Sequence, residues 1–249
     1  MIIQWKMVWH SIRIFLDLRI RMDIFKGFHQ WEKKLPRKPL ANRDQYIIER
    51  CRGRDVVHLG ACDSPMTIDK GAKGELLHQR LQGECRSLLG FDEDWNATNI
   101  LKTKFNISDI EFGDLSRIDK KLTPIADVVI CADIIEHVDN VGNLLTNCNR
   151  LCREGGILLL STVHALSVKQ VLRAMIGREP VHPDHVAYFS FATLGVILER
   201  FGFSMTDCRF FKYPTVSKLS RLIFDGLYSI FPQIADGIVV EAIKKTGNV

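Results

Sequence analysis

The 249-residue sequence has no long apolar run, since no stretch reaches the ~18–20 uninterrupted apolar residues that a membrane span requires. Near its start the apolar residues are interrupted by Lys6, His10, Arg13 and Asp17, and no small-residue cleavage site follows, unlike a secretory signal peptide. The seven cysteines are odd in number and include no C-x-x-C pair, so no disulfide framework is expected. These absences predict a cytoplasmic protein with reduced thiols.

A surplus of positive charge is also missing from most of the chain. Residues 1–38 hold nine Lys or Arg against three acidic residues, a local surplus that exceeds the net charge of +5 of the whole sequence. The remainder therefore has no basic face in composition, and it has no Asn/Asp-Pro-Pro-Tyr/Phe signature. Nucleic acid is therefore disfavoured as a partner.

Residues 3–32 have apolar side chains mostly three or four positions apart, which predicts an amphipathic helix with aromatic and Arg-rich sides. We expect residues 1–40 to form a helical extension and residues 41–249 to form the main domain. Two interpretations of the extension remain open. It covers the pocket of the main domain, or it lies as a peripheral contact on the inner face of a membrane beside Arg13, Arg19 and Arg21.

After a helix near Arg43–Cys51, short apolar strands alternate with helical segments. Strands are predicted at Asp55–Leu59, Ser87–Phe91, Ile110–Phe112, Ala126–Ala132, Ile157–Ser161, Ser204–Tyr213 and Gly237–Lys244. Helices are predicted at Gly74–Gln82, Asn96–Phe105, Val141–Cys152, Phe191–Phe201 and 215–233. This alternation predicts an α/β fold with a mostly parallel sheet and right-handed crossovers.

The first strand leads into the turn Leu59-Gly60-Ala61-Cys62-Asp63, at the place where doubly wound sheets bind ligands. The second strand ends at Asp92, an acid placed to accept hydrogen bonds from both hydroxyls of a ribose. Alternatively, Asp92-Glu93-Asp94 is a solvated cluster at a helix start. Gly113-Asp114-Leu115 follows the third strand, where an acid could meet an adenine amino group.

Two further segments, Asp127 to Val138 and Leu151 to Thr162, complete a pattern that resembles class I S-adenosylmethionine-dependent methyltransferases. The pattern continues through His185-Val-Ala-Tyr-Phe-Ser190 and Glu199 to Phe203. At a finer level, the sequence resembles family members whose genes lie among bacterial surface-polysaccharide genes. The resemblance implies a Rossmann-like sheet of seven strands in the order 3-2-1-4-5-7-6, the last antiparallel, with helices on both faces. It also implies S-adenosyl-L-methionine as cofactor, bound at Gly60, Ala61, Cys62, Asp63, Asp92, Glu93, Asp114, Leu115 and Asp133.

The glycine turn departs from the family pattern h-D-h-G-x-G-x-G. His58 stands where the family has its first acid, and Cys62 and Ser64 replace its second and third glycines. Asp63 is a candidate to replace the missing acid as a partner for the cofactor's ammonium group.

The candidate catalytic residues are His137, His185 and Glu136, with His164 and His182 as further imidazoles near the same edge of the sheet. Methyl transfer to a hydroxyl needs a base or a metal that lowers the hydroxyl's pKa. Asp133, Glu136, His137 and His185 could hold a divalent cation, and a similar arrangement occurs in related small-RNA 2′-O-methyltransferases and some quinone O-methyltransferases. Alternatively, Glu136 and His137 cap a helix and position the cofactor loop.

Together these features predict O-methylation of a small molecule or glycan precursor. The alternatives are a quinone or lipid acceptor at a membrane surface, and a catalytically silent cofactor-binding module that scaffolds a partner enzyme. The apolar stretch Leu219–Phe231 could contribute to the acceptor pocket. The sequence does not indicate the oligomeric state.

Overall fold

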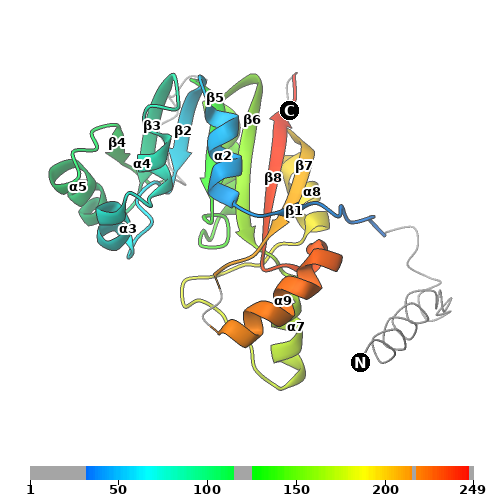
Figure 1. The fold of residues 1–249 in the computed structure, drawn as a ribbon. Coiled ribbons are helices and arrows are strands. Elements are labelled where there is room, and N and C mark those ends of the chain that lie inside the picture. Colours follow the sequence, from blue (N-terminus) through cyan, green and yellow to red (C-terminus); the bar gives the residue numbers. More distant parts are fainter. Residues whose placement is uncertain (1–31, 115–124, 215–216, 247–249) are drawn as a thin grey trace, which may run out of the picture. The chain divides into compact units, whose positions relative to one another are not determined.

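The computed structural model describes residues 32–114, 125–214 and 217–246 (Figure 1). The chain divides into two compact units, Met1–Lys34 and Leu35–Val249, and the fold described below is that of the second. The helix predicted at residues 3–32 lies, except for its last residue, outside the described residues, as does Leu115. Among the described helices, none is both long and apolar enough to cross a membrane.

The strands and helices alternate as the sequence predicts. The strands are β1 (Pro39–Leu40), β2 (Asp55–Leu59), β3 (Ser87–Asp92), β4 (Ile110–Phe112), β5 (Ala126–Ala132), β6 (Cys152–Val163), β7 (Phe203–Phe211) and β8 (Gly237–Lys244). The helices are α2 (Arg43–Cys51), α3 (Thr67–Lys73), α4 (Leu77–Leu81), α5 (Trp95–Lys104), α6 (Val141–Leu151), α7 (Val168–Met175), α8 (Phe191–Arg200), α9 (Lys218–Ile230) and the 3-10 turn η3 (Pro232–Ile234).

The sheet has the order β1-β7-β8-β6-β5-β2-β3-β4. Without β1 this is the predicted order 3-2-1-4-5-7-6, and β8 is antiparallel to both β6 and β7, so the predicted topology is confirmed. The eighth strand, β1, pairs in parallel with β7, where Phe210 N donates to Lys38 O at 3.0 Å. Its two residues include Pro39, which has no N–H and is tolerated at a sheet edge. No strand was predicted at this position.

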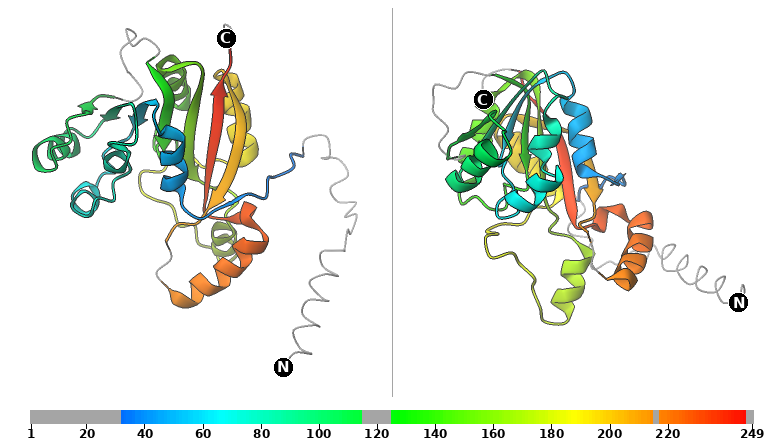
Figure 2. Two further views of the ribbon diagram at one scale, coloured as in Figure 1. Left: turned by 45° about the horizontal axis from the view of Figure 1, so that its top comes forward. Right: turned by 60° about the vertical axis from the view of Figure 1, so that its left-hand side comes forward.

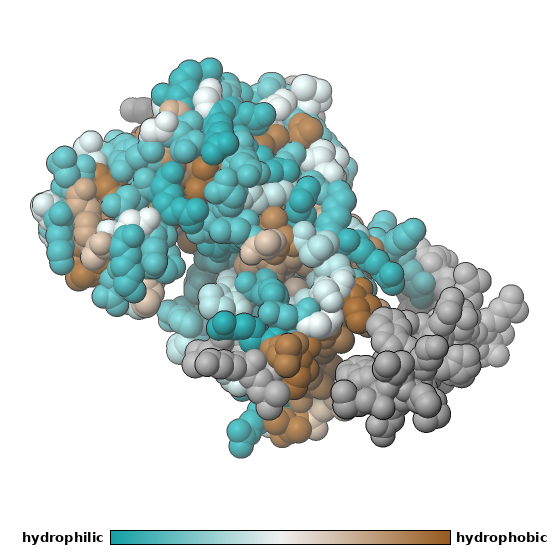
Figure 3. Space-filling view, in the orientation of Figure 1, coloured by the Kyte–Doolittle hydropathy of each residue, from teal (hydrophilic) through white to brown (hydrophobic). Residues whose placement is uncertain are grey.

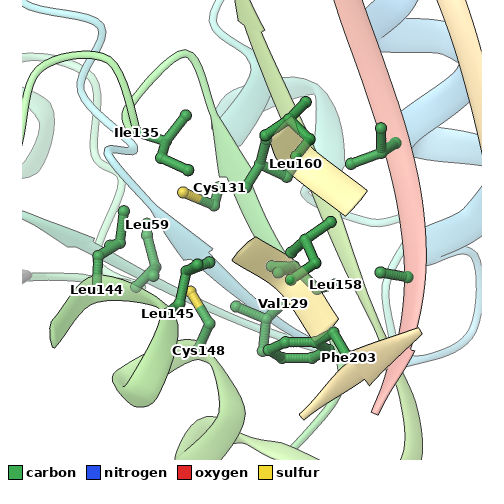
Figure 4. Packing of buried hydrophobic residues seen from close by; sticks show 14 of the residues in the cluster. Leu59, Val129, Cys131, Ile135, Leu144, Leu145, Cys148, Leu158, Leu160 and Phe203 are labelled. Carbon is green, nitrogen blue, oxygen red and sulfur yellow. The ribbon is translucent and has the colours of Figure 1, made fainter. Parts of the chain in front are cut away.

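Helices cover both faces of the sheet (Figure 2). On one face α6 and α8 pack through Leu144, Leu145, Leu194 and Leu198, and Figure 4 shows the α6 side chains against those of β5 and β6. On the other face α2 and α4 pack against the same strands. Because β5 is buried on both faces, its run of apolar residues is continuous.

The predicted helices need two corrections. The helix expected at Gly74–Gln82 is observed as the shorter α4, and it is preceded by α3, which was not predicted and which ends at Gly74 with φ +68°. Helix α7 was not predicted; it has no buried residue and exposes Val171, Leu172 and Met175. Its apolar residues are nevertheless three and four positions apart, so the periodic signal of an amphipathic helix is present in this segment.

Candidate functional site

The predicted cofactor turn directly follows β2. Gly60 has φ +71°, and a Cβ built on it would lie 2.0 Å from Ile134 Cδ1 and 2.6 Å from Ile134 Cγ1. Its amide donates to Phe91 O at 2.8 Å, which ties the turn to the end of β3. Both the backbone conformation and the close approach therefore require glycine here.

Asp92, at the end of the neighbouring strand β3, holds the same turn by a hydrogen bond. Its Oδ2 accepts from Cys62 N at 2.8 Å, and its Oδ1 accepts from Asp94 N at 2.9 Å. The side chain is 7% exposed and lines the cleft described below. Each carboxylate oxygen has a second lone pair, so hydroxyls of a ligand can bind without displacing the backbone.

Cys62 lies beneath the turn rather than in the cleft. Its side chain is fully buried, with Sγ 3.6 Å from Thr98 Oγ1, and burial raises the pKa of the thiol to about 12. The residue that replaces a family glycine therefore fills the interior instead of blocking the approach of a ligand.

A cleft of about 530 Å³ opens over this turn at the carboxyl ends of β2, β3 and β5. Of the predicted cofactor residues, Gly60, Ala61, Asp63, Asp92, Glu93 and Asp133 line it. Asp63 is paired with Lys70 of α3, so this acid already has a cationic partner. Burial, and then the nearby carboxylate of Asp114, raise the pKa of Glu93. Asp114 itself is exposed and lies beyond the residues that line the cleft.

His58 occupies the position of the family acid and also lines the cleft. Its Nδ1 lies 3.3 Å from Nδ1 of His78, whose Nε2 lies 3.6 Å from Asp109 Oδ1. Burial, and then His78 and Arg43, lower the pKa of His58 well below its ordinary value. A neutral imidazole therefore stands where the family pattern has a negative charge.

Asp133 forms a network that joins four segments of the chain. Its carboxylate pairs with Arg43, and its Oδ1 accepts from Ser161 Oγ at 2.9 Å and from Tyr213 OH at 3.3 Å. Burial lowers the pKa of Arg43, but Asp133 and Asp44 more than offset this effect and raise it. Arg43 lines the cleft and was not anticipated from the sequence. The available signal was a basic residue at the start of the helix that precedes the first central strand.

Glu136 lies in the interior and not in the cleft. It is 1% exposed, and its Oε2 accepts from Thr162 Oγ1 at 2.7 Å while its Oε1 accepts from Val163 N at 3.4 Å. Burial, and then Asp133, raise the pKa of this carboxyl to about 7. Its main-chain oxygen accepts from Val186 N at 2.8 Å and from Ala187 N at 3.3 Å. Glu136 therefore holds the loop that carries His185, and in this structure it does not face the reacting groups.

Three histidines meet at the wall of the cleft. His137 follows β5, and His182 and His185 lie on the loop before α8. The ring centroids are 4.6 Å apart for His137 and His185, 5.8 Å for His137 and His182, and 5.1 Å for His182 and His185. His164, the remaining predicted imidazole, is 1% exposed, and its Nδ1 lies 3.3 Å from Ala235 O, away from the cleft. The structure therefore brings together two of the predicted catalytic residues and adds His182.

The known proteins to which this chain is similar include methyltransferases. A profile of the family described as "Methyltransferase domain" matches residues 50–207. A probable S-adenosylmethionine-dependent methyltransferase of Mycolicibacterium smegmatis is 27% identical over 66% of this chain and 57% of its own length. A ubiquinone biosynthesis O-methyltransferase of Nitrosomonas europaea is 28% identical over 61% of this chain and 64% of its own length. The chain thus spans less than two thirds of the length of either relative.

Two solved structures share the fold. A SAM-dependent methyltransferase from Archaeoglobus fulgidus superposes with a TM-score of 0.53 at 18% identity, covering 80% of this chain and 90% of the other. A protein from Bacillus halodurans described as a methyltransferase gives 0.56 at 14% identity, covering 82% and 98%.

Proposed function

Since the chain belongs to the S-adenosylmethionine-dependent methyltransferase family, we propose that it transfers a methyl group from this cofactor to a hydroxyl of a small molecule or glycan precursor. The observation that carries the proposal is a single cleft holding both the Gly60 turn with Asp92 and the imidazoles of His137 and His185. Binding groups and a candidate base therefore share one solvent-accessible space.

The chain's own residues fit the cofactor. The Gly60 turn leaves room that a Cβ would fill, and Asp92 offers free lone pairs to the ribose hydroxyls. Arg43 offers a guanidinium to the carboxylate of the methionine end, and Glu93 lies beside Asp92. The cofactor supplies a methyl group on a sulfonium, which is displaced in line, so much of the rate depends on alignment.

His185 is proposed as the base that takes the proton of the acceptor hydroxyl. Burial, and then His137 and His182, lower its pKa, so the imidazole is neutral and able to accept a proton near pH 7. With the cofactor bound, His185 would accept the hydroxyl proton as the acceptor oxygen takes the methyl group and S-adenosylhomocysteine leaves. His137 lies in ring contact with His185 and is proposed to position it.

The ribose assignment is tested with Asp92→Ala in a calorimetric titration of cofactor. Loss of hydrogen bonds to a carboxylate costs about 1.5–3 kcal/mol, so we expect the Kd to rise roughly 10- to 150-fold. Glu111→Ala removes an exposed acid on β4 that does not line the cleft, and should leave the Kd unchanged. Equal affinity of Asp92→Ala and the parent protein would refute the assignment.

The methyl-transfer assignment is tested by formation of S-adenosylhomocysteine with hydroxylated acceptors, comparing the parent chain with His185→Gln. We expect turnover to fall about 10²- to 10⁴-fold while cofactor affinity is retained. Cofactor binding without turnover on any acceptor would instead favour the silent scaffold module.

A quinone or lipid acceptor at a membrane surface is favoured by a second observation. Apolar side chains are exposed on α7 and α9, and Figure 3 shows apolar surface over α9. They include Val171, Leu172 and Met175 on α7, Leu222, Ile223 and Ile230 on α9, and Leu166 and Ile176 beside the ends of α7. Gln170, Val171, Ala174 and Tyr188 also line a hollow of about 570 Å³. The name of the Nitrosomonas europaea relative points to the same acceptor class.

The lipid alternative predicts that Leu172→Glu combined with Met175→Glu lowers binding to anionic vesicles and raises the KM for an apolar acceptor. Both side chains are exposed, so the fold should survive. Placing two charges in the lipid interface opposes burial of the apolar face. An unchanged KM for apolar and polar acceptors alike would remove support for this alternative.

A further inference from the structure

The three histidines at the cleft wall form a group that the methyl-transfer proposal uses only in part. One ligand atom from each of His137, His182 and His185 lies within 4.8 Å of the other two. They come from two segments, the end of β5 and the loop before α8. Because main-chain bonds from Val186 and Ala187 to Glu136 hold these segments together, the group is assembled by the fold and not by chance contact on one loop.

One nitrogen in this group has no hydrogen-bond partner. His185 Nδ1 is buried and makes no hydrogen bond to a described residue. A buried polar atom without a partner is destabilising, so an unpaired imidazole nitrogen beside two other imidazoles calls for an explanation. Asp184 lies between His182 and His185 in the sequence; its backbone N–H donates to His182 Nδ1 at 3.3 Å, and its Oδ2 lies 3.7 Å from the same nitrogen.

The four residues expected from the sequence as metal ligands are not brought together. Asp133 is held by Arg43, Ser161 and Tyr213, and Glu136 is turned into the interior toward β6. Among the described residues, the group with suitably placed ligand atoms consists of imidazoles alone. This difference matters chemically, because Mg²⁺ prefers carboxylate and water oxygens whereas imidazole suits Zn²⁺, Co²⁺ and Ni²⁺.

We propose that His137, His182 and His185 bind one borderline divalent transition-metal ion of the Zn²⁺ or Co²⁺ type, leaving its fourth position open to the cleft. In a tetrahedral site with metal–nitrogen bonds of ~2.1 Å, the nitrogens lie roughly 3.4 Å apart, so the three atoms need to draw together by about an ångström. His182 and His137 are exposed, so their rings are free to turn inward.

The consequence for the reaction rests on the proposed function. An acceptor hydroxyl in the open position would lose its proton more readily, because a bound cation lowers the pKa of an oxygen ligand. His185 would then act as a ligand, and the proton would leave through solvent. The His185→Gln variant reduces turnover in both schemes, so binding of the metal has to be measured directly.

The test is a titration of the chelator-treated protein with Co²⁺, followed by its visible absorption, and with Zn²⁺, followed by calorimetry, without cofactor or acceptor. We expect one equivalent to bind with the intense visible bands of tetrahedral Co²⁺. Loss of an outer-shell partner weakens metal affinity 10–100-fold, so His182→Ala and His185→Ala should each weaken it more than roughly 100-fold. Glu136→Gln should retain it, with circular dichroism confirming that each variant is folded.

Binding that fails in the parent protein, or that survives His182→Ala, would overturn the site. Equal weakening by Glu136→Gln and His182→Ala would overturn the three-imidazole ligand set. If the metal binds stoichiometrically but turnover is unchanged after chelation, the metal-binding site is supported and its role in methyl transfer is refuted. Because the titration contains neither cofactor nor acceptor, its outcome is independent of whether the proposed methylation is correct.

Discussion

The contact between Gly60 and Ile134 gives the most quantitative prediction. In Gly60→Ala the new Cβ would lie 2.0 Å from Ile134 Cδ1, and the backbone would hold an alanine at φ +71°. The left-handed conformation costs an L-residue about 1–2 kcal/mol. Overpacking costs typically 1–3 kcal/mol more, because Ile134 packs against the core and cannot withdraw freely. We therefore expect the free energy of unfolding to fall by roughly 2–5 kcal/mol.

Two further variants separate these contributions in urea and thermal unfolding. Gly53 has φ +66° with nothing within 4 Å of a Cβ, so Gly53→Ala measures the backbone cost alone. In Gly60→Ala combined with Ile134→Ala the steric part disappears, and the two substitutions should show a coupling energy of about 1–3 kcal/mol. Each kcal/mol shifts the Tm of a domain this size by about 2–4 °C.

The reasoning would be refuted if Gly60→Ala cost less than about 0.5 kcal/mol, the scale of an ordinary surface substitution. It would also fail if Ile134→Ala brought no recovery. In either case the turn would be able to relax, and glycine would not be required for the close approach.

One substitution and one chemical modification probe charge and burial. Burial raises the pKa of Asp207, but hydrogen bonds from Lys38, Arg209 and Tyr46 more than offset this effect, and the pKa is lowered. The ionised Asp207 therefore stabilises the folded protein above pH ~4, and this stabilisation is lost as the pH falls. Asp207→Asn should therefore lower the unfolding free energy at pH 7, by a difference that shrinks towards pH 3 in urea titrations; a constant difference would contradict it. With a thiol pKa raised to about 12, Cys62 should resist alkylation at pH 8 in the folded protein and react at once in denaturant. Rapid labelling of the folded chain, located by mass spectrometry, would show that the turn opens.

The sheet was predictable because its central strands are buried on both faces. A run such as Ala126–Ala132 is apolar at nearly every position, and the structure gives that strand the predicted bounds. The edge strand Pro39–Leu40 escaped prediction because two residues show no periodicity, and its pairing depends on the distant β7. Helix α7 was missed although Val168, Val171, Leu172 and Met175 have the three- and four-residue spacing of a helix face.

The sequence predicted which residues meet at the candidate site better than it predicted the contacts that their side chains make. Gly60, Asp92 and Asp133 follow strands whose carboxyl ends meet at one edge, so chain order alone indicated that they share a cleft. Sequence spacing could not show which way Glu136 turns, because at i+3 from Asp133 it was equally able to face the cleft or β6. Arg43 comes from a helix outside the family motifs, and only the folded chain places it beside Asp133.

The network around Asp133 has a consequence for how the protein is made. Its members lie at positions 43, 133, 161 and 213, so they leave the ribosome at widely separated times. A nascent chain that has exposed the Gly60 turn and Asp92 still lacks Tyr213, and this wall of the cleft is incomplete. A cofactor whose binding depends on this wall would therefore stabilise the finished domain more than the amino-terminal half during synthesis.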